Sequence, residues 1–377
     1  MNETIRSLFP ALETYTYLNS AAVSPMPITA VEAINSQLMD VATHGSAHYQ
    51  DWVDTKNRAR GLAAEMLGVE AEQIAFMRNT SDGFATIANG LTWRSGDNIV
   101  SFGREFPANF YPWRRIRDEY GVELRLCSEK DGRVDIEELL SFIDGNTRVV
   151  ALSSVQYASG YRADLERIGR AARAVDALFC ADIIQGFGAL PYDLPAQLVD
   201  AASGASHKWL CAAEGCGILY LSDRARERIK PTLVGWISVE TPWDFEDREQ
   251  PFRSTALALE SGTATSSLFY GLEQSLKLLH ETGAEKIETH LMKLSDQICD
   301  GLGGTDFNVI SSRRPGEKSQ IVCVKHSGGK HPNQIAEDLS SKKIVVSPRG
   351  DRLRIAPHFY NDQSDVDCLL DALRSVD

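Results

Sequence analysis

The 377-residue sequence predicts an α/β fold with a mostly parallel central sheet, because helical and strand-like segments alternate along it. LERIGRAARAVDA (165–177) has the apolar spacing of a helix, and LFCAD (178–182), which follows it, is a short apolar strand that ends in an acid. TRVVALSSV (147–155) and GILYL (217–221) are also strand-like. Helices that alternate with apolar strands are typical of a sheet covered on both faces.

Two features suggest where such a sheet would hold a ligand. Ligands gather at the carboxyl ends of parallel strands, and Asp182 and Gln185 fall at the end of one such strand. RNTSDGFATIANGL (78–91) predicts a loop that leads into a helix, with Thr80 as its cap and Gly90 at its end. The amino terminus of a helix is a favourable place for an anion.

The chain from about residue 265 onward has a different pattern. Two helical segments (266–300) precede the strand-like QIVCVKH (320–326) and a last helix near 364–375. We therefore expect a boundary near residue 260. The expected domains are a large domain, 16–260, and a smaller α+β domain, 261–377, on which residues 1–15 pack.

Composition narrows the class of protein. The formal net charge of −13 opposes binding to nucleic acid or to anionic membranes. No apolar run of 18 residues and no cationic leader is present, so we expect a cytoplasmic protein without a membrane anchor. The seven cysteines include no CxxC pair, which argues against disulfides and a zinc site, and we expect no metal.

One ordered set of residues suggests a cofactor. Neither GxGxxG nor GxxxxGK[ST] occurs, so dinucleotide and P-loop functions lose their main support. Taken singly, the members of the set have ordinary explanations as helix caps, turn residues, core aromatics or surface charges. The set consists of Thr80, Ser81, Phe106, Asp182, Gln185, Ser206, His207 and Lys208.

Together these residues meet the chemical needs of pyridoxal phosphate (PLP). PLP needs a lysine amine for its Schiff base, and the same amine later moves protons at the substrate α-carbon. A buried carboxylate keeps the pyridine nitrogen protonated, because an opposite charge favours the charged form. Hydroxyls and backbone N–H groups at a helix amino terminus suit the phosphate, and an aromatic ring can fix the plane of the cofactor.

The chain resembles the class V aminotransferases of PLP fold type I, the group with cysteine desulfurases, selenocysteine lyases, isopenicillin-N-epimerase-like proteins and kynureninase. The resemblance covers nearly the whole chain and rests on seven ordered segments. They are YLNSAAVSPMP (17–27), NTSDG (79–83), EFPANFYPW (105–113), ADIIQGFG (181–188), SGASHKW (203–209), ESGTATSSLFYGL (260–272) and LRIAPHFYN (353–361).

The resemblance implies a role for each candidate residue. Lys208 would be the Schiff-base lysine, and Asp182 would pair with the pyridine nitrogen. Arg354 would bind the substrate carboxylate, with Arg349 as the alternative. The remaining cofactor contacts would be Gln185 near the ring oxygen, Phe106 on the ring face, Thr80, Ser81, Ser206 and His207 around the phosphate, and Thr263 reaching the phosphate of the partner subunit in a homodimer with shared sites.

Two departures from the desulfurase pattern separate the possible activities. Desulfurases have a histidine where this chain has Phe106, and they carry a cysteine on a loop that corresponds to VVSPRGDRLRIAP (345–357), which has none. Tyr157 stands where they have an asparagine near the cofactor, so it is a candidate substrate contact. We expect an enzyme that acts on an amino acid, first an aminotransferase, second a C–S or β-elimination lyase or an epimerase-like enzyme. The intact Lys208 and Asp182 argue against a catalytically silent PLP-fold protein.

Overall fold

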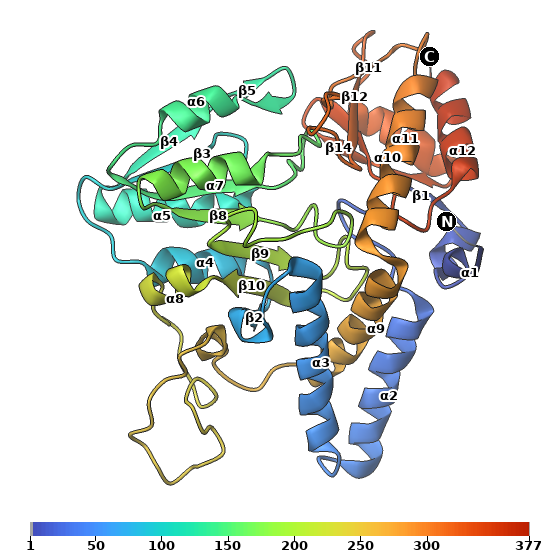
Figure 1. Cartoon of the computed structure of the whole chain (residues 1–377). Helices are drawn as coiled ribbons and strands as arrows, with labels where there is room; N and C mark the ends of the chain where they lie inside the picture. Colours follow the sequence, from blue (N-terminus) through green and yellow to red (C-terminus); the bar gives the residue numbers. More distant parts are fainter. Residues whose placement is uncertain (1–2, 377) are drawn as a thin grey trace.

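The computed structural model describes residues 3–376, and its central element is a seven-stranded sheet (Figure 1). The strands are β2 (Ile74–Met77), β3 (Asn98–Phe102), β4 (Glu123–Cys127), β7 (Thr147–Ser153), β8 (Leu178–Asp182), β9 (Ala201–Ala205) and β10 (Gly217–Leu221). They lie in the order β2-β10-β9-β8-β7-β3-β4. Only β10 runs antiparallel to its neighbours in this sheet. The prediction of a mostly parallel sheet is confirmed.

The central strands send alternate side chains into two apolar layers. In β7, Val150 and Leu152 belong to one layer, and Val149 and Ala151 belong to the other. A strand buried on both faces needs apolar residues at every position, which explains the unbroken apolar runs in the sequence. The other elements of this part are α2 (Ile28–His44), α3 (Tyr49–Leu67), η2 (Ala71–Gln73), α4 (Thr80–Gly90), η3 (Pro107–Asn109), α5 (Tyr111–Tyr120), β5 (Glu129–Lys130), β6 (Arg133–Val134), α6 (Ile136–Ser141), α7 (Leu165–Ala174), α8 (Asp223–Arg228) and η4 (Ala256–Leu259).

A second sheet lies in the carboxyl-terminal part of the chain, with four antiparallel strands in the order β11-β12-β15-β14. Three helices share one apolar core with it. The elements are α10 (Ala284–Gly301), β11 (Phe307–Val309), β12 (Val322–His326), α11 (Pro332–Ser341), β14 (Ser347–Arg349), β15 (Arg352–Ile355) and α12 (Gln363–Arg374). This arrangement confirms a smaller α+β unit beside the main sheet.

The first residues of the chain contact this smaller unit. Arg6 donates to Oδ2 of Asp365 over 2.6 Å, and β1 pairs in parallel with β13. Helix α9 instead lies along α2 and α3 (Figure 1). The elements concerned are α1 (Glu3–Arg6), η1 (Pro10–Glu13), β1 (Thr16–Tyr17), α9 (Ser266–Thr282) and β13 (Ile344–Val345). The contacts support the proposed packing of residues 1–15 on the small domain, and the boundary near residue 260 stays a prediction. Between residues 3 and 376, no helix has both the length and the apolar character of a membrane span.

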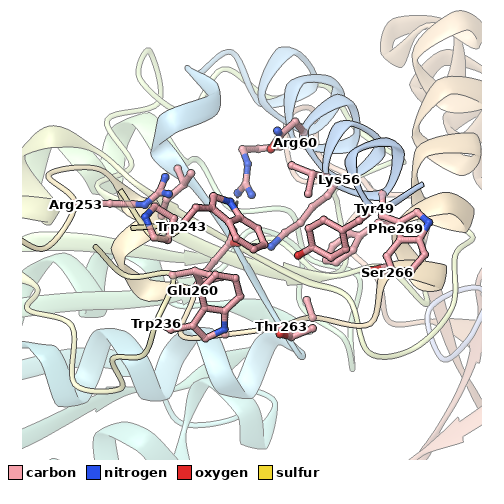
Figure 2. A pocket seen from close by; sticks show the side chains of 18 residues that line it. Tyr49, Lys56, Arg60, Trp236, Trp243, Arg253, Glu260, Thr263, Ser266 and Phe269 are labelled. Carbon is pink, nitrogen blue, oxygen red and sulfur yellow. Dashed lines mark hydrogen bonds and ion pairs between the residues drawn. The ribbon is translucent and has the colours of Figure 1, made fainter. Parts of the chain in front are cut away.

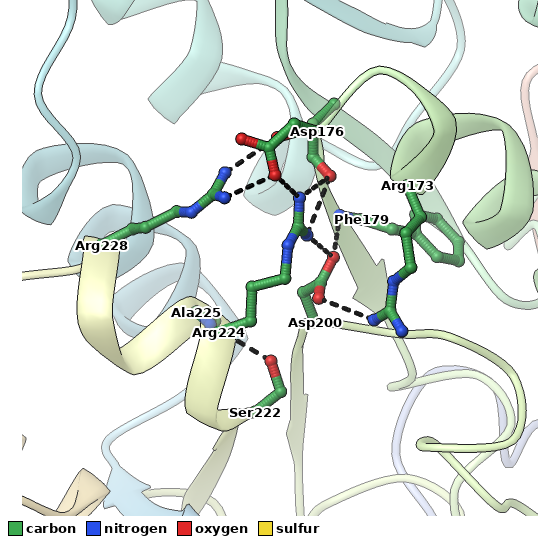
Figure 3. Close-up of polar contacts among 9 residues, drawn as sticks. Arg173, Asp176, Phe179, Asp200, Ser222, Arg224, Ala225 and Arg228 are labelled. Carbon is green, nitrogen blue, oxygen red and sulfur yellow. Dashed lines mark hydrogen bonds and ion pairs between the residues drawn. The ribbon is translucent and has the colours of Figure 1, made fainter.

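A buried carboxylate, Asp200, ties together the strands that lead to the candidate site (Figure 3). It accepts hydrogen bonds from the backbone N–H of Phe179 at 2.9 Å, from Arg224 at 2.7 Å and from Arg173 at 3.2 Å. Strand β9 begins directly after Asp200, and Phe179 lies in β8, which ends at Asp182. The network therefore holds the ends of two neighbouring strands in register.

We expect Asp200→Ala to lower the free energy of unfolding by about 3 kcal/mol, because it leaves a buried N–H of Phe179 and the Arg224 guanidinium without their acceptor. Urea denaturation measures the change. Asp371→Ala is the matched control, since Asp371 forms an exposed pair with Arg374 and its loss should cost less than about 0.5 kcal/mol. Equal effects of the two substitutions would contradict this role of Asp200.

Candidate active site

The structure brings most of the predicted site residues into one pocket of about 260 Å³. Strands β2, β8 and β9 run in the same direction, and the segments that follow their carboxyl ends supply the pocket with Thr80, Asp182 and Lys208. The lining residues are Ala21, Ala22, Asn79, Thr80, Ser81, Phe106, Ala108, Tyr157, Asp182, Ile184, Gln185, His207, Lys208, Arg349 and Arg354.

Lys208 is a buried cation at the base of this pocket, and only 7% of it is exposed. Its Nζ lies 5.3 Å from the centre of the Phe106 ring. Burial lowers the pKa of the Lys208 amine, the charge of Asp182 opposes that shift, and the charge of Arg354 adds to it. A lowered pKa favours the neutral amine, which is the form that reacts with a carbonyl carbon.

Asp182 ends β8 and has one free carboxylate oxygen. Its Oδ1 accepts the backbone N–H of Ile184 at 2.9 Å, while Oδ2 is buried and has no hydrogen-bond partner in residues 3–376. Burial raises the pKa of this carboxyl group, and the charge of Glu105 raises it further. A buried, half-satisfied carboxylate that faces a pocket is an acceptor prepared for a ligand N–H.

The amino terminus of α4 forms another wall of the pocket. Asn79 caps this helix, because its backbone is extended and its Oδ1 accepts the N–H of Asp82 at 2.9 Å. The prediction that Thr80 is the cap is therefore wrong. Because Asn79 caps the helix, the Thr80 hydroxyl is not used for that purpose, and it is buried without a hydrogen-bond partner in the described chain. An unpaired hydroxyl at a helix amino terminus suits an anion.

Phe106 and Tyr157 meet edge to face at the pocket, with their ring centroids 5.2 Å apart. The residue before Phe106, Glu105, is fully buried and holds this segment in place. Its carboxylate accepts hydrogen bonds from the Ser153 backbone N–H at 2.8 Å and from Nε2 of Gln156 at 2.7 Å. Burial raises the pKa of Glu105, and these hydrogen bonds partly oppose that shift.

Two arginines from neighbouring strands supply positive charge. Nε of Arg354 donates to Ser347 at 3.2 Å, and Nη1 donates to the carbonyl of Tyr157 at 3.2 Å. Its Nη2 is buried without a partner in the described residues. Burial lowers the pKa of Arg354 to about 9, and the charge of Arg349 contributes to that shift. The pocket thus contains a guanidinium with a donor group still available.

Gln185 and His207 also line the pocket, but Gln185 is largely engaged by the protein. Its Nε2 donates to the carbonyl of Ala21 at 3.0 Å, and its Oε1 accepts Nε1–H of Trp209 at 2.9 Å. One amide hydrogen remains for a ligand. Burial lowers the pKa of His207, and the charge of Lys208 lowers it further. Both side chains are placed where they could contact a cofactor.

Two predicted contacts lie outside this pocket. The hydroxyl of Ser206 donates to the carbonyl of Ala213, and the residue is fully buried. Thr263 is exposed and lines a separate cavity beside Lys56 and Glu260 (Figure 2). A contact between Thr263 and a cofactor phosphate therefore requires a second copy of the chain, as the homodimer expectation states, and the phosphate role of Ser206 stays a prediction.

Several residues that shape the site carry little signal in the sequence. Asn79 could be found only by weighing the residue before Thr80 as the helix cap. Glu105 adjoins Phe106 in EFPANFYPW, but nothing local shows that its carboxylate is buried. Arg349 entered only as an alternative to Arg354, and the structure places both in the pocket.

These features fit PLP. The buried amine of Lys208, the free Oδ2 of Asp182, the unpaired hydroxyl of Thr80 at a helix amino terminus and the ring of Phe106 meet the requirements of its aldehyde, pyridine nitrogen, phosphate and ring face. The fold and these residues define a PLP-dependent enzyme of fold type I. The chain belongs to the class-V aminotransferase family, whose description "Aminotransferase class-V" matches residues 16–369.

Similar proteins span the whole length of the chain. It is 27% identical to a probable cysteine desulfurase of Methanothermobacter thermautotrophicus, over 99% of this chain and 98% of the relative. It is 24% identical to an uncharacterized aminotransferase of Bacillus subtilis, with 98% and 97% covered. Two solved structures share the fold at 23% identity. They are a cysteine desulfurase from Thermococcus onnurineus (TM-score 0.91, 100% and 98% covered) and the cystine C–S lyase C-DES in complex with cysteine persulfide (TM-score 0.89, 97% and 99% covered).

Proposed function

We propose that the protein transfers the amino group of an amino acid whose carboxylate is held by Arg354. The observation that carries this proposal is the unpaired Nη2 of Arg354, buried in the same pocket as the Lys208 amine. A planar guanidinium with a free N–H is well suited to a carboxylate. Arg349 lines the same pocket and adds a second positive charge.

The residues of the pocket divide the work of this reaction. Bound PLP supplies an electron-withdrawing ring that stabilises negative charge at the substrate α-carbon. Lys208 would hold the cofactor covalently and then carry the proton of the α-carbon, a task that its burial favours by keeping the amine neutral. Asp182 would keep the pyridine nitrogen protonated. Phe106 has no titratable group, so it would contribute only shape and exclusion of water.

Persulfide formation, the step that defines a desulfurase, has little support here. Among the described residues, none of those lining the pocket is a cysteine. Cys323 is buried in β12, and burial raises the pKa of its thiol to about 11. Cys368 is exposed on α12, which does not line the pocket. Persulfide chemistry needs an accessible, activated thiolate.

Elimination at a C–S bond is the second candidate. One structure with this fold is described as a cystine C–S lyase, and elimination uses the same lysine to remove the α-proton. The two activities differ in the fate of the substrate electrons: transfer reprotonates at the cofactor, and elimination expels the β-substituent.

Product analysis separates the two candidates. The holoenzyme is incubated with a panel of amino acids, with and without a keto acid. Transamination yields pyridoxamine phosphate and, when a keto acid is supplied, a new amino acid. Elimination from a sulfur amino acid yields pyruvate, ammonia and sulfide or persulfide without any keto acid. The second set of products would replace the aminotransferase proposal by the lyase.

Arg354→Ala should raise KM for the amino acid and lower kcat/KM by about 30-fold, which corresponds to about 2 kcal/mol for a lost charged hydrogen bond. The cofactor should still bind, because Lys208 and Asp182 are unchanged. Steady-state kinetics provide the measurement, and Arg374→Ala, a substitution of an exposed arginine, is the control. An unchanged kcat/KM would move the carboxylate site to Arg349.

We also infer that two copies of the chain share their sites. Thr263 is exposed, and the neighbouring loop presents large apolar side chains to solvent: Trp236, Trp243, Phe245 and Phe252 are between 38% and 57% or 58% exposed (Figure 2). Exposed apolar groups of this size are typical of interfaces. Sedimentation velocity tests the inference, and a monomer at micromolar concentration with full activity would contradict it.

A further inference from the structure

A cluster of two histidines and one aspartate lies outside the cofactor pocket, where helices α2 and α3 meet. Nδ1 of His44 lies 3.0 Å from Oδ1 of Asp40, and Nδ1 of His48 lies 2.7 Å from the same oxygen. One ligand atom from each residue falls within 4.8 Å of the others, and among residues 3–376 this is the one group of three or more such side chains with that property. The two imidazole rings have their centroids 4.9 Å apart.

The backbone around the cluster is well determined. Asp40 and His44 are one turn apart on α2, so they share a face of that helix. Gly45 then adopts a positive φ of 61° and reverses the chain, with its N–H bonded to the carbonyl of Val41 at 2.9 Å. The reversal brings His48, which precedes α3, back to the same carboxylate. Two elements therefore converge on one point.

The carboxylate is also oriented from behind. Nε1 of Trp52 lies 3.4 Å from Oδ2 of Asp40, which leaves Oδ1 to the two histidines. Contacts of this kind to the second oxygen orient a ligating carboxylate. The side chains of His44 and His48 are about half exposed, and Asp40 is 24% exposed, so an ion can reach the cluster from solvent.

We propose that Asp40, His44 and His48 form a binding site for a divalent first-row transition metal, with Zn²⁺ as the reference ion. Two imidazoles and one carboxylate are ligands that Zn²⁺ prefers, and they discriminate against Mg²⁺ and Ca²⁺, which take oxygen ligands. Neighbouring ligand atoms of a tetrahedral zinc ion are about 3.4 Å apart. The observed separations of 2.7 and 3.0 Å need only a small rotation of exposed rings. The net charge of −13 also favours a cation.

The position of the site suggests what bound metal would do. Tyr49 and Trp52, which follow His48 directly, line the cavity that also contains Thr263 (Figure 2). The ring of Tyr49 packs against Trp243 of the exposed aromatic loop, with a centroid separation of 5.5 Å. An ion that fixes the α2–α3 turn would therefore hold one wall of that cavity. This site supplies no group to the reaction and does not depend on the proposed transamination.

Calorimetric titration of the metal-free, PLP-loaded protein with ZnCl₂ tests the site. The wild type is expected to bind one Zn²⁺ per chain, and Mg²⁺ is expected not to compete. His44→Ala and His48→Ala should each weaken zinc binding at least tenfold. His280→Ala is the matched control, because His280 is an exposed helical histidine with a single carboxylate neighbour, Glu65.

A second measurement is independent of stoichiometry at other histidines. Amide hydrogen exchange of residues 44–49 should slow when Zn²⁺ is added to the wild type and should stay unchanged in the His44→Ala, His48→Ala double variant. The variants replace exposed side chains, so their folds should be intact by circular dichroism. Equal zinc affinity in the wild type and the double variant, or the absence of zinc binding in the wild type, would overturn the proposal.

Discussion

Lys208→Ala is expected to abolish turnover, lowering kcat/KM by at least about 10³-fold, because one substitution removes both the covalent attachment of the cofactor and the group that carries the α-proton. The visible absorption band of the attached cofactor should disappear. PLP should still bind, more weakly, since Asp182, Phe106 and the amino terminus of α4 remain in the pocket. Absorption spectra before and after dialysis, followed by kinetics, measure these effects.

A matched control distinguishes chemistry from loss of a charge. Lys277→Ala removes a lysine that is 60% exposed on α9, and it should leave both the spectrum and the rate unchanged. The Lys208 variant should have a native circular dichroism spectrum, because removal of a buried cation relieves a desolvation cost. Normal turnover of Lys208→Ala would show that another amine does this work.

Asp182→Asn should have opposite effects on activity and on stability. At neutral pH the substitution removes the negative charge that would keep the pyridine nitrogen protonated, so we expect kcat/KM to fall about 100-fold, or about 3 kcal/mol. In the cofactor-free protein the same carboxylate has an unpaired buried oxygen and a raised pKa. A neutral amide should therefore make the cofactor-free protein more stable, by about 1 kcal/mol.

Two measurements test this pair of expectations separately. Kinetics of the PLP-loaded variant give the first, and urea denaturation of the cofactor-free variant gives the second. Asp371→Asn, at an exposed position, should change neither by more than about 0.5 kcal/mol. A variant of Asp182 that kept full activity, or one that was less stable without cofactor, would contradict the role that we assign to this carboxylate.

The secondary structure followed closely from the sequence pattern. The helix expected at 165–177 is α7 (Leu165–Ala174), and the strand expected at 178–182 is β8 (Leu178–Asp182). Helix α7 ends early because Asp176 takes a positive φ of 62°, which its carboxylate stabilises through Arg224 and Arg228. Hydrophobic periodicity marks such elements well and their last residues poorly.

The direction of β10 (Gly217–Leu221) was outside the reach of the sequence. Its apolar run predicted a strand, and nothing in the run distinguishes a parallel from an antiparallel neighbour. The direction follows from the connection after β9, which turns through the lysine segment and returns the chain alongside the same strand. Gly217 permits this return, since a Cβ there would lie 2.7 Å from the backbone of Asn79.

The metal cluster shows the same limit. Asp40, His44 and His48 are spaced by four residues, which suggests one face of a helix, yet α2 ends at His44 and the turn at Gly45 returns His48 to the carboxylate. The expectation of no metal rested on the cysteines, and it did not weigh these three residues. Whether they bind an ion is left to the titration.

The sequence by itself determined the class of fold, the family and the cofactor, because periodicity and ordered short motifs are local properties of the chain. Only the tertiary structure decided which polar atoms stay free. Arg354 loses two donor groups to Ser347 and Tyr157, of which Tyr157 is 197 residues away, and keeps one for a ligand. Ser206 turns its hydroxyl away from the pocket to a carbonyl seven residues on. Hydrogen-bond partners depend on how distant segments pack, and that information is not contained in any one segment.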